Sequence, residues 1–151
     1  MSANNDPSPQ DLASTEACRN LVVDCASLID ETRYDELARI FAVDGVFARP
    51  TAPDAPIVGR DAIIAAFKLR PANKLSQHLV TNIRVWLTGT DTAEGTSSIM
   101  LYLTDVDVSV EPGKGRKCTG PLLGVYKDRY VYTPEGWRIA DRRGRVTMYG
   151  G

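Results

Sequence analysis

The second half of the chain holds four long segments with the composition of β-strands, and this feature limits the fold more than any other. Valine, isoleucine, threonine, tyrosine and tryptophan recur in these segments, and short turns rich in glycine, proline and aspartate separate them. The segments span about residues 76–88, 92–107, 117–133 and 136–149. Because short turns join them, the sequence predicts an antiparallel meander in which each strand pairs with the next one along the chain.

The first half of the chain has apolar residues at helical spacing. This pattern predicts helices over about residues 11–31, 34–42 and 62–68. A short strand is predicted at 45–49, and a turn region at 50–56, where three prolines prevent regular hydrogen bonding. Three helices that precede a meander must cover one of its faces, so the predicted fold class is α+β.

The size and composition are typical of one compact globular domain. Of 151 residues, 43% are hydrophobic and 25% are charged. Residues 1–10 are rich in asparagine, serine and proline and are predicted to be a disordered tail, which leaves residues 11–151 as a single domain. The net charge of −1 argues against a nucleic-acid partner, which would require a surplus of basic residues on one face.

The apolar runs are too short to cross a bilayer, and the amino terminus lacks the features of a secretory signal, so we expect a cytoplasmic protein without membrane contact. Three cysteines, Cys18, Cys25 and Cys118, have the spacing of neither a zinc site nor a redox pair. They are expected to be reduced and mostly buried. A metal site would have to use carboxylates and a single histidine, so we expect no metal and no organic cofactor.

Four short motifs follow one another along the chain. They are Leu37–Phe47 (LARIFAVDGVF), Val58–Ile63 (VGRDAI), His78–Asn82 (HLVTN) and Gly136–Ile139 (GWRI). Their order resembles the SnoaL-like branch of the nuclear transport factor 2-like superfamily, over nearly all of the chain beyond the tail. The resemblance implies a cone-shaped, strongly curved, mostly antiparallel sheet whose concave face is covered by three N-terminal helices and encloses an apolar pocket.

The resemblance does not fix a function. Relatives include polyketide cyclases, steroid isomerases, dehydratases, epoxide hydrolases, noncatalytic small subunits of ring-hydroxylating dioxygenases and plain binding modules. The epoxide-hydrolase relatives use two aspartates with an arginine between them, and the fitting strand of this chain has no such triplet. The remaining enzymatic relatives favour a lyase or an isomerase.

His78 is the only histidine, and it lies at the start of the first long strand. Histidine is the one side chain whose ordinary pKa allows proton transfer near neutral pH. Asp30 lies at the end of the first predicted helix, at the border of its apolar face, from which a carboxylate can reach inward. Dehydratase-like relatives pair an aspartate and a histidine at these two positions, so the resemblance implies an Asp30–His78 pair.

Such a pair has a specific chemical use. A carboxylate that accepts a hydrogen bond from one imidazole nitrogen leaves the other nitrogen to take a proton from a substrate carbon and return it. In the alternative interpretation, Asp30 caps a helix or faces solvent, and His78 is an ordinary core residue. Cys25 occupies a position at which those relatives have a tyrosine, so one phenol donor of the family pattern is missing.

Several other side chains are candidates for substrate binding. Tyr102, Tyr126 and Tyr130 lie on predicted strands and can donate to a substrate carbonyl, but the sequence leaves open which of them face the pocket. Arg49 occupies a position at which some relatives place a pocket tyrosine, so it favours an anionic substrate group or is a surface charge. Arg143 belongs to a basic cluster on the last strand, of which at least one member could face the pocket mouth or an oligomer interface.

The leading hypothesis is a cofactor-independent lyase or isomerase, dehydratase-like or cyclase-like, that acts by acid/base catalysis on a small hydrophobic carbonyl compound, with a polycyclic or aromatic compound as one option. The alternative is a noncatalytic small-molecule-binding or assembly module, such as one resembling a dioxygenase small subunit. In either case, a sheet covered by helices on one face leaves its outer face free for a partner. The resemblance implies a homodimer or higher homo-oligomer through that face.

Overall fold

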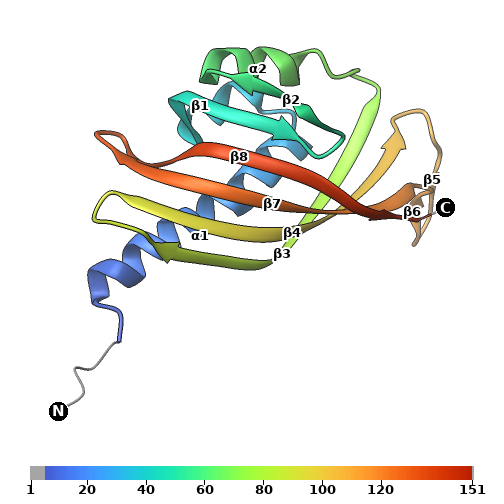
Figure 1. Ribbon diagram of the computed structural model, residues 1–151. Helices are drawn as coiled ribbons and strands as arrows, with labels where there is room; N and C mark the ends of the chain where they lie inside the picture. The colour runs from blue at the N-terminus through green and yellow to red at the C-terminus, as the bar shows by residue number, and fades with distance from the viewer. Residues whose placement is uncertain (1–5, 151) are drawn as a thin grey trace.

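The computed structural model describes residues 6–150, which form an α+β domain around one strongly curved sheet (Figure 1). In the described residues, six strands form the main sheet in the order β2-β1-β8-β7-β4-β3. They are β1 (Phe41–Arg49), β2 (Ala52–Val58), β3 (Lys74–Leu87), β4 (Thr92–Asp105), β7 (Thr119–Thr133) and β8 (Gly136–Tyr149). The predicted fold class is confirmed.

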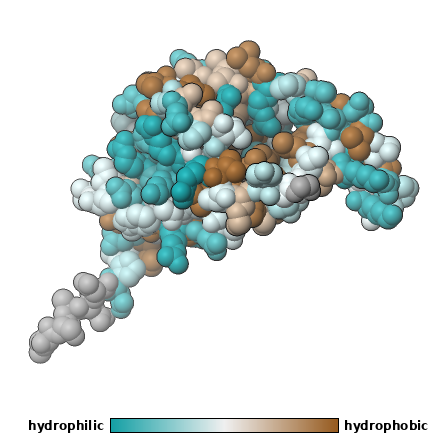
Figure 2. Space-filling view, turned by 45° about the vertical axis from the view of Figure 1, so that its right-hand side comes forward, coloured by the Kyte–Doolittle hydropathy of each residue, from teal (hydrophilic) through white to brown (hydrophobic). Residues whose placement is uncertain are grey.

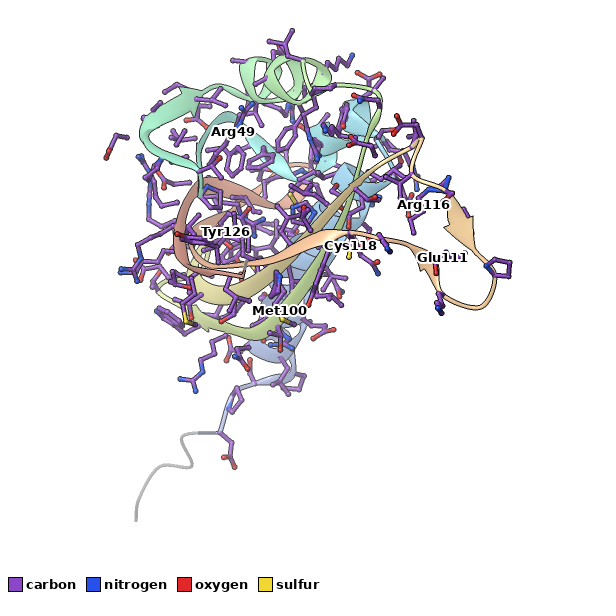
Figure 3. The ribbon with its side chains drawn as sticks, turned by 90° about the vertical axis from the view of Figure 1, so that its right-hand side faces the viewer. Arg49, Met100, Glu111, Arg116, Cys118 and Tyr126 are labelled. Carbon is purple, nitrogen blue, oxygen red and sulfur yellow. The ribbon has the colours of Figure 1, made fainter. Side chains whose placement is uncertain are left out.

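The four long strands form the predicted meander. Strands β3, β4, β7 and β8 pair antiparallel in sequence order. The one parallel pair joins β1 to β8, so the first strand of the chain lies beside the last. Between β4 and β7, the short strands β5 (Val110–Glu111) and β6 (Gly115–Arg116) form a separate hairpin that stands away from the body of the domain (Figure 3).

Three helices precede or interrupt the early strands: α1 (Pro9–Asp30), the 3-10 helix η1 (Tyr34–Arg39) and α2 (Arg60–Lys68). Helix α1 runs along the concave face of the sheet (Figure 1) and buries one stripe that includes Leu21, Val22, Cys25 and Leu28. None of the helices in residues 6–150 has the length and apolar character that crossing a membrane requires.

The amino-terminal boundary differs from the prediction. Ser8 caps α1, accepting a hydrogen bond from the backbone N–H of Asp11, whose carboxylate accepts one from the Ser8 N–H. This reciprocal pair satisfies two otherwise unpaired N–H groups, so the helix begins at Pro9 and residues 9 and 10 do not belong to a tail. Residues 1–5 of the predicted tail lie outside the described residues.

Two local predictions in the early region were wrong. The predicted helix over 34–42 ends at Arg39, and β1 begins at Phe41 because this residue pairs with Ile139 of β8. The predicted turn region at 50–56 is largely strand β2. Pro53 and Pro56 are tolerated because β2 is an edge strand that pairs only with β1, so the N–H groups on its other side have no neighbouring strand to bond.

Strand β3 has a bulge at Asn82. Its φ of 50° lies in the left-handed region, which asparagine enters more readily than most residues. The pairing with β4 shifts by one residue here, between Thr81 and Arg84. The bulge increases the local twist and curvature, so His78 and Val80 before it and Ile83 after it all face the concave side.

A buried ion pair lies within the sheet's concave side. Arg142 of β8 donates two hydrogen bonds of 2.8 Å to the carboxylate of Asp128 on β7, and both residues are 3% exposed. Tyr130 donates a further hydrogen bond of 3.1 Å to Asp128. Burial alone lowers the pKa of Arg142, but the Asp128 carboxylate raises that pKa well above its ordinary value, so the guanidinium is charged.

We expect the effects of substituting Asp128 and Arg142 on the free energy of unfolding to be strongly coupled. Asp128→Asn or Arg142→Met alone leaves one buried charge without compensation and should lower the free energy of unfolding by about 3–5 kcal/mol. The double variant, which removes both charges, should lose less than the sum of the two single variants. Urea unfolding of all four proteins measures the coupling, and additive losses would contradict it.

Candidate functional site

Asp30 and His78 form a hydrogen-bonded pair. His78 Nδ1 lies 2.6 Å from Asp30 Oδ1, and the backbone N–H of His78 donates to Asp30 Oδ2 over 2.7 Å. The two side chains are 19% and 13% exposed, respectively. The pair is therefore largely shielded from solvent, and the carboxylate contacts both the ring and the backbone of His78.

The end of one element and the start of another create this contact. Asp30 is the last residue of α1, and His78 lies near the start of β3, which packs against α1. Ser76, also on β3, donates a hydrogen bond of 2.8 Å to Asp30 Oδ1. Arg70, after α2, donates to Ser76 Oγ over 3.2 Å. Three elements thus fix the position of the Asp30 carboxylate.

The surroundings hold Asp30 in its ionised form. Partial burial raises the pKa of this carboxyl group, but hydrogen bonds from the His78 ring, the His78 backbone and the Ser76 hydroxyl together bring its pKa below the ordinary value. A carboxylate in this position favours the His78 tautomer with its proton on Nδ1. Nε2, which has no hydrogen-bond partner within residues 6–150, is then the free acid/base atom.

A cavity of about 220 Å³ lies beside the pair. His78 lines this cavity together with two arginines. Aromatic and aliphatic side chains from the sheet and the helices line most of the rest. The apolar lining includes Ile29, Phe47, Pro50, Phe67, Ile99, Leu101 and Leu122. The predicted pair therefore lies where its free nitrogen can meet a bound molecule.

The three candidate tyrosines lie in different surroundings, and one of them lines the cavity. Tyr126 lines the cavity, and its ring lies against the Arg142 guanidinium, 4.3 Å from Cζ to the ring centroid. Burial raises its pKa above the ordinary value, so the phenol is protonated and able to donate. Tyr130 lies deeper and donates to Asp128, and Tyr102 lines a separate surface hollow with Gln77, so neither lines the cavity.

Arg143 does not line the cavity, which corrects the sequence-based choice. It is exposed and paired with Asp141 at 2.8 Å. Strict alternation from the buried Ile139 would point Arg143 inward, but Ala140 is an extra residue in the pairing between β7 and β8. This bulge reverses the alternation, so Arg142 is the residue that points inward.

Two arginines line the cavity. Arg49, a predicted candidate, ends β1 and donates to the Ala66 carbonyl of α2 over 3.2 Å (Figure 3). Arg70 was missed, because an arginine just after a helix and before a proline usually serves the helix end. Within residues 6–150, no group of three or more histidine, cysteine, aspartate or glutamate side chains is arranged to hold a metal ion.

Residues 10–143 match the model of the SnoaL-like domain. The chain belongs to this family. The match spans most of the chain, including α1, the Asp30–His78 pair and the cavity. No curated protein matches the sequence.

Solved structures with the same fold include several enzymes. A scytalone dehydratase candidate from Novosphingobium aromaticivorans is 23% identical, with a TM-score of 0.76 over 92% of this chain and 87% of that one. The hexachlorocyclohexane dehydrochlorinase LinA-type3 from Novosphingobium barchaimii is 20% identical, with a TM-score of 0.77 over 95% and 93%. A Mycobacterium tuberculosis protein of unknown function is 23% identical, with a TM-score of 0.75 over 96% and 78%. At these identities, the likeness shows a shared fold.

The lowered pKa of Asp30 predicts a contribution to stability that depends on pH. As pH falls below about 4, the unfolded chain takes up the Asp30 proton before the folded protein does, so stability falls. Asp30→Asn lacks this dependence. The difference in free energy of unfolding between wild type and Asp30→Asn should shrink on acidification below about pH 4. Urea unfolding across this range measures it, and a difference that grows with acid would contradict the assignment.

Proposed function

We propose that this protein is a cofactor-independent lyase or isomerase in which His78 transfers protons and Asp30 orients it. The single observation that carries the proposal is the 2.6 Å contact between His78 Nδ1 and Asp30 Oδ1 beside a largely apolar cavity. A histidine held in this way is suited to act as both general base and general acid near neutral pH. The dehydratase and dehydrochlorinase among the structures of the same fold support this reaction type by analogy.

The proposed reaction begins with removal of a proton from a carbon next to a carbonyl group. Nε2 of His78 takes the proton, and the C–H electron pair moves toward the carbonyl oxygen, to which the Tyr126 hydroxyl donates a hydrogen bond. In a dehydration, a C–O bond at the next carbon then breaks, and the leaving hydroxide takes the proton from Nε2 and departs as water. In an isomerisation, Nε2 returns the proton to a different carbon.

The size of the cavity favours a small substrate. Its volume of about 220 Å³ is below the range of about 300–1,000 Å³ that is common for pockets of drug-sized ligands. A compact carbonyl compound fits this volume better than the polycyclic compound that the sequence left as an option. We place the reaction in the cytoplasm, a proposal that the free thiols of Cys18, Cys25 and Cys118 support.

The noncatalytic alternative has less support. This alternative predicts that His78 packs against aliphatic side chains, beyond hydrogen-bond distance from Asp30, and has no cavity beside it. In the structure, the two residues are in hydrogen-bond contact, and His78 lines the cavity. A histidine ring oriented by a carboxylate beside a cavity is the arrangement that acid/base catalysis uses, so we favour catalysis.

Deuterium exchange tests the proton transfer whatever the leaving group is. The protein is incubated in D₂O with a panel of small ketones and β-hydroxy ketones, and loss of the α-hydrogen signal is followed by proton NMR. His78→Ala should slow exchange by about 100-fold or more, and Asp30→Asn should also slow it strongly. Tyr126→Phe should slow it by about 100-fold through loss of the donor.

The control for this assay is Gln77→Ala. Gln77 precedes His78 on β3 but is exposed on the outer face, so this variant should exchange at the wild-type rate. Circular dichroism verifies that each variant is folded. If His78→Ala and Asp30→Asn both retain wild-type exchange, acid/base catalysis by this pair is refuted.

Self-association through the outer sheet face stays a prediction. Leu79, Met100, Leu123 and Met148 are paired across β3, β4, β7 and β8 and form an apolar row on this face. Figure 2 shows apolar surface on the body of the domain between hydrophilic regions. Val125 and its partner Arg145 lie next to the row on the same face.

Charge introduced into this row should separate the subunits. Leu79 and Met148 are 43% and 62% exposed, so Leu79→Lys and Met148→Lys are tolerated in a folded monomer. Light scattering after size exclusion should give a dimer for wild type and a monomer for each variant. Val43→Lys, at an apolar residue 68% exposed elsewhere, is the control and should remain dimeric. A monomeric wild type would contradict the prediction.

A further inference from the structure

We propose that the molecule bound in this cavity carries a carboxylate group and that Arg49 and Arg70 bind it. The substrate class is then a small oxo acid whose apolar part contacts the aliphatic and aromatic lining. This inference rests on the proposed function in one respect, namely that the cavity beside His78 is the substrate site. It goes further because it assigns the charge of the substrate and a role to Arg70.

The cavity lining carries two positive charges and no negative one. Arg49 and Arg70 contribute guanidinium groups, and no aspartate or glutamate is among the lining residues. Within residues 6–150, neither guanidinium forms an ion pair with a carboxylate. An arginine is charged at all physiological pH values, and the ionised Asp30 reaches Arg70 only through the Ser76 hydroxyl, so within the described residues neither guanidinium contacts a negative group.

Other arginines that are removed from solvent show a different arrangement. Arg142 is paired with Asp128 at 2.8 Å, Arg138 lies 3.8 Å from Glu135, and Arg60 lies 4.0 Å from the same glutamate. The domain thus supplies carboxylate partners to several partly or fully buried arginines and leaves out the two that line the cavity. A bound anion would supply the missing negative charge.

Both guanidinium groups are oriented but keep most of their donors free. Each has five N–H donors, of which Arg49 uses one with the Ala66 carbonyl and Arg70 one with Ser76 Oγ, both at 3.2 Å. The Phe67 ring supports Arg49, with its centroid 5.9 Å from Cζ. Arginines held in this way can donate paired hydrogen bonds to a carboxylate, which is the geometry that a guanidinium favours.

Arg70 also connects the anion site to the acid/base pair. It binds Ser76, and Ser76 donates to Asp30, which orients His78. A carboxylate held by Arg70 would therefore lie within the same hydrogen-bonded group as the proton-transferring residue. This arrangement places the reacting carbon of a short oxo acid near His78, because the cavity allows little distance between its ends.

A matched pair of probes tests the preference for a carboxylate. Cyclohexanecarboxylate and cyclohexanecarboxamide have the same size and differ in charge. Their binding to the full-length protein is measured by titration calorimetry at low ionic strength and pH 8, where an ordinary histidine is mostly neutral. Wild type should bind the carboxylate about 10- to 100-fold more tightly than the amide.

Variants identify the source of this preference. Arg49→Met and Arg70→Met should each remove most of the preference and leave the affinity for the amide unchanged, and Arg49→Lys should retain part of it. Arg145→Met makes the same charge change at an exposed residue of β8 and should keep the full preference.

Four outcomes would overturn the proposal: no binding of the carboxylate by wild type, equal affinity for the two probes, an equal loss in Arg145→Met, or displacement of the carboxylate by inorganic phosphate at lower concentration. The proposed function is tested separately. Exchange that depends on His78 without a carboxylate preference would refute the oxo acid and leave the acid/base mechanism intact. A carboxylate preference without such exchange, in a panel that also contains small oxo acids, would refute the acid/base mechanism and leave the anion site intact.

Discussion

The carboxylate of Asp30 joins the helical half of the domain to its sheet. It accepts hydrogen bonds from Ser76 Oγ and from the ring and backbone nitrogens of His78, so the last residue of α1 is attached to the start of β3 at three points. The same contacts fix the histidine ring and define one wall of the cavity. A single buried group therefore serves both the packing of a helix on a sheet and the geometry of the site.

A second buried charge supports the opposite wall. Arg142 is neutralised by Asp128 and lies against the ring of Tyr126, which lines the cavity. Because this arginine is already paired, it orients the tyrosine and supplies no uncompensated charge to the cavity. The free positive charges come from Arg49 and Arg70 at other points of the lining. Arg142 is bonded to a carboxylate, whereas Arg49 and Arg70 are bonded to neutral oxygens, and this difference separates their roles.

Much of this arrangement could be predicted from residue patterns. The four long strands and their turns predicted the meander, and the border position of Asp30 on its helix, together with the family resemblance, predicted the contact with His78. The errors arose where pairing overrides local pattern. Phe41 and Ala42 are strand residues because they lie beside β8, and the prolines of 50–56 fit a strand because that strand has one neighbour.

The sequence by itself determined the class of fold and the meander of long strands, because both depend on short-range periodicity and on turn residues, and the family resemblance predicted the contact between Asp30 and His78. Only the tertiary structure decided which strand residues face the cavity. One extra residue at Ala140 turns Arg142 inward and Arg143 outward, and a long-range approach brings Arg49 and Arg70 to one cavity from separate elements. Bulges and contacts between distant elements depend on the pairing of whole strands, which no local pattern specifies.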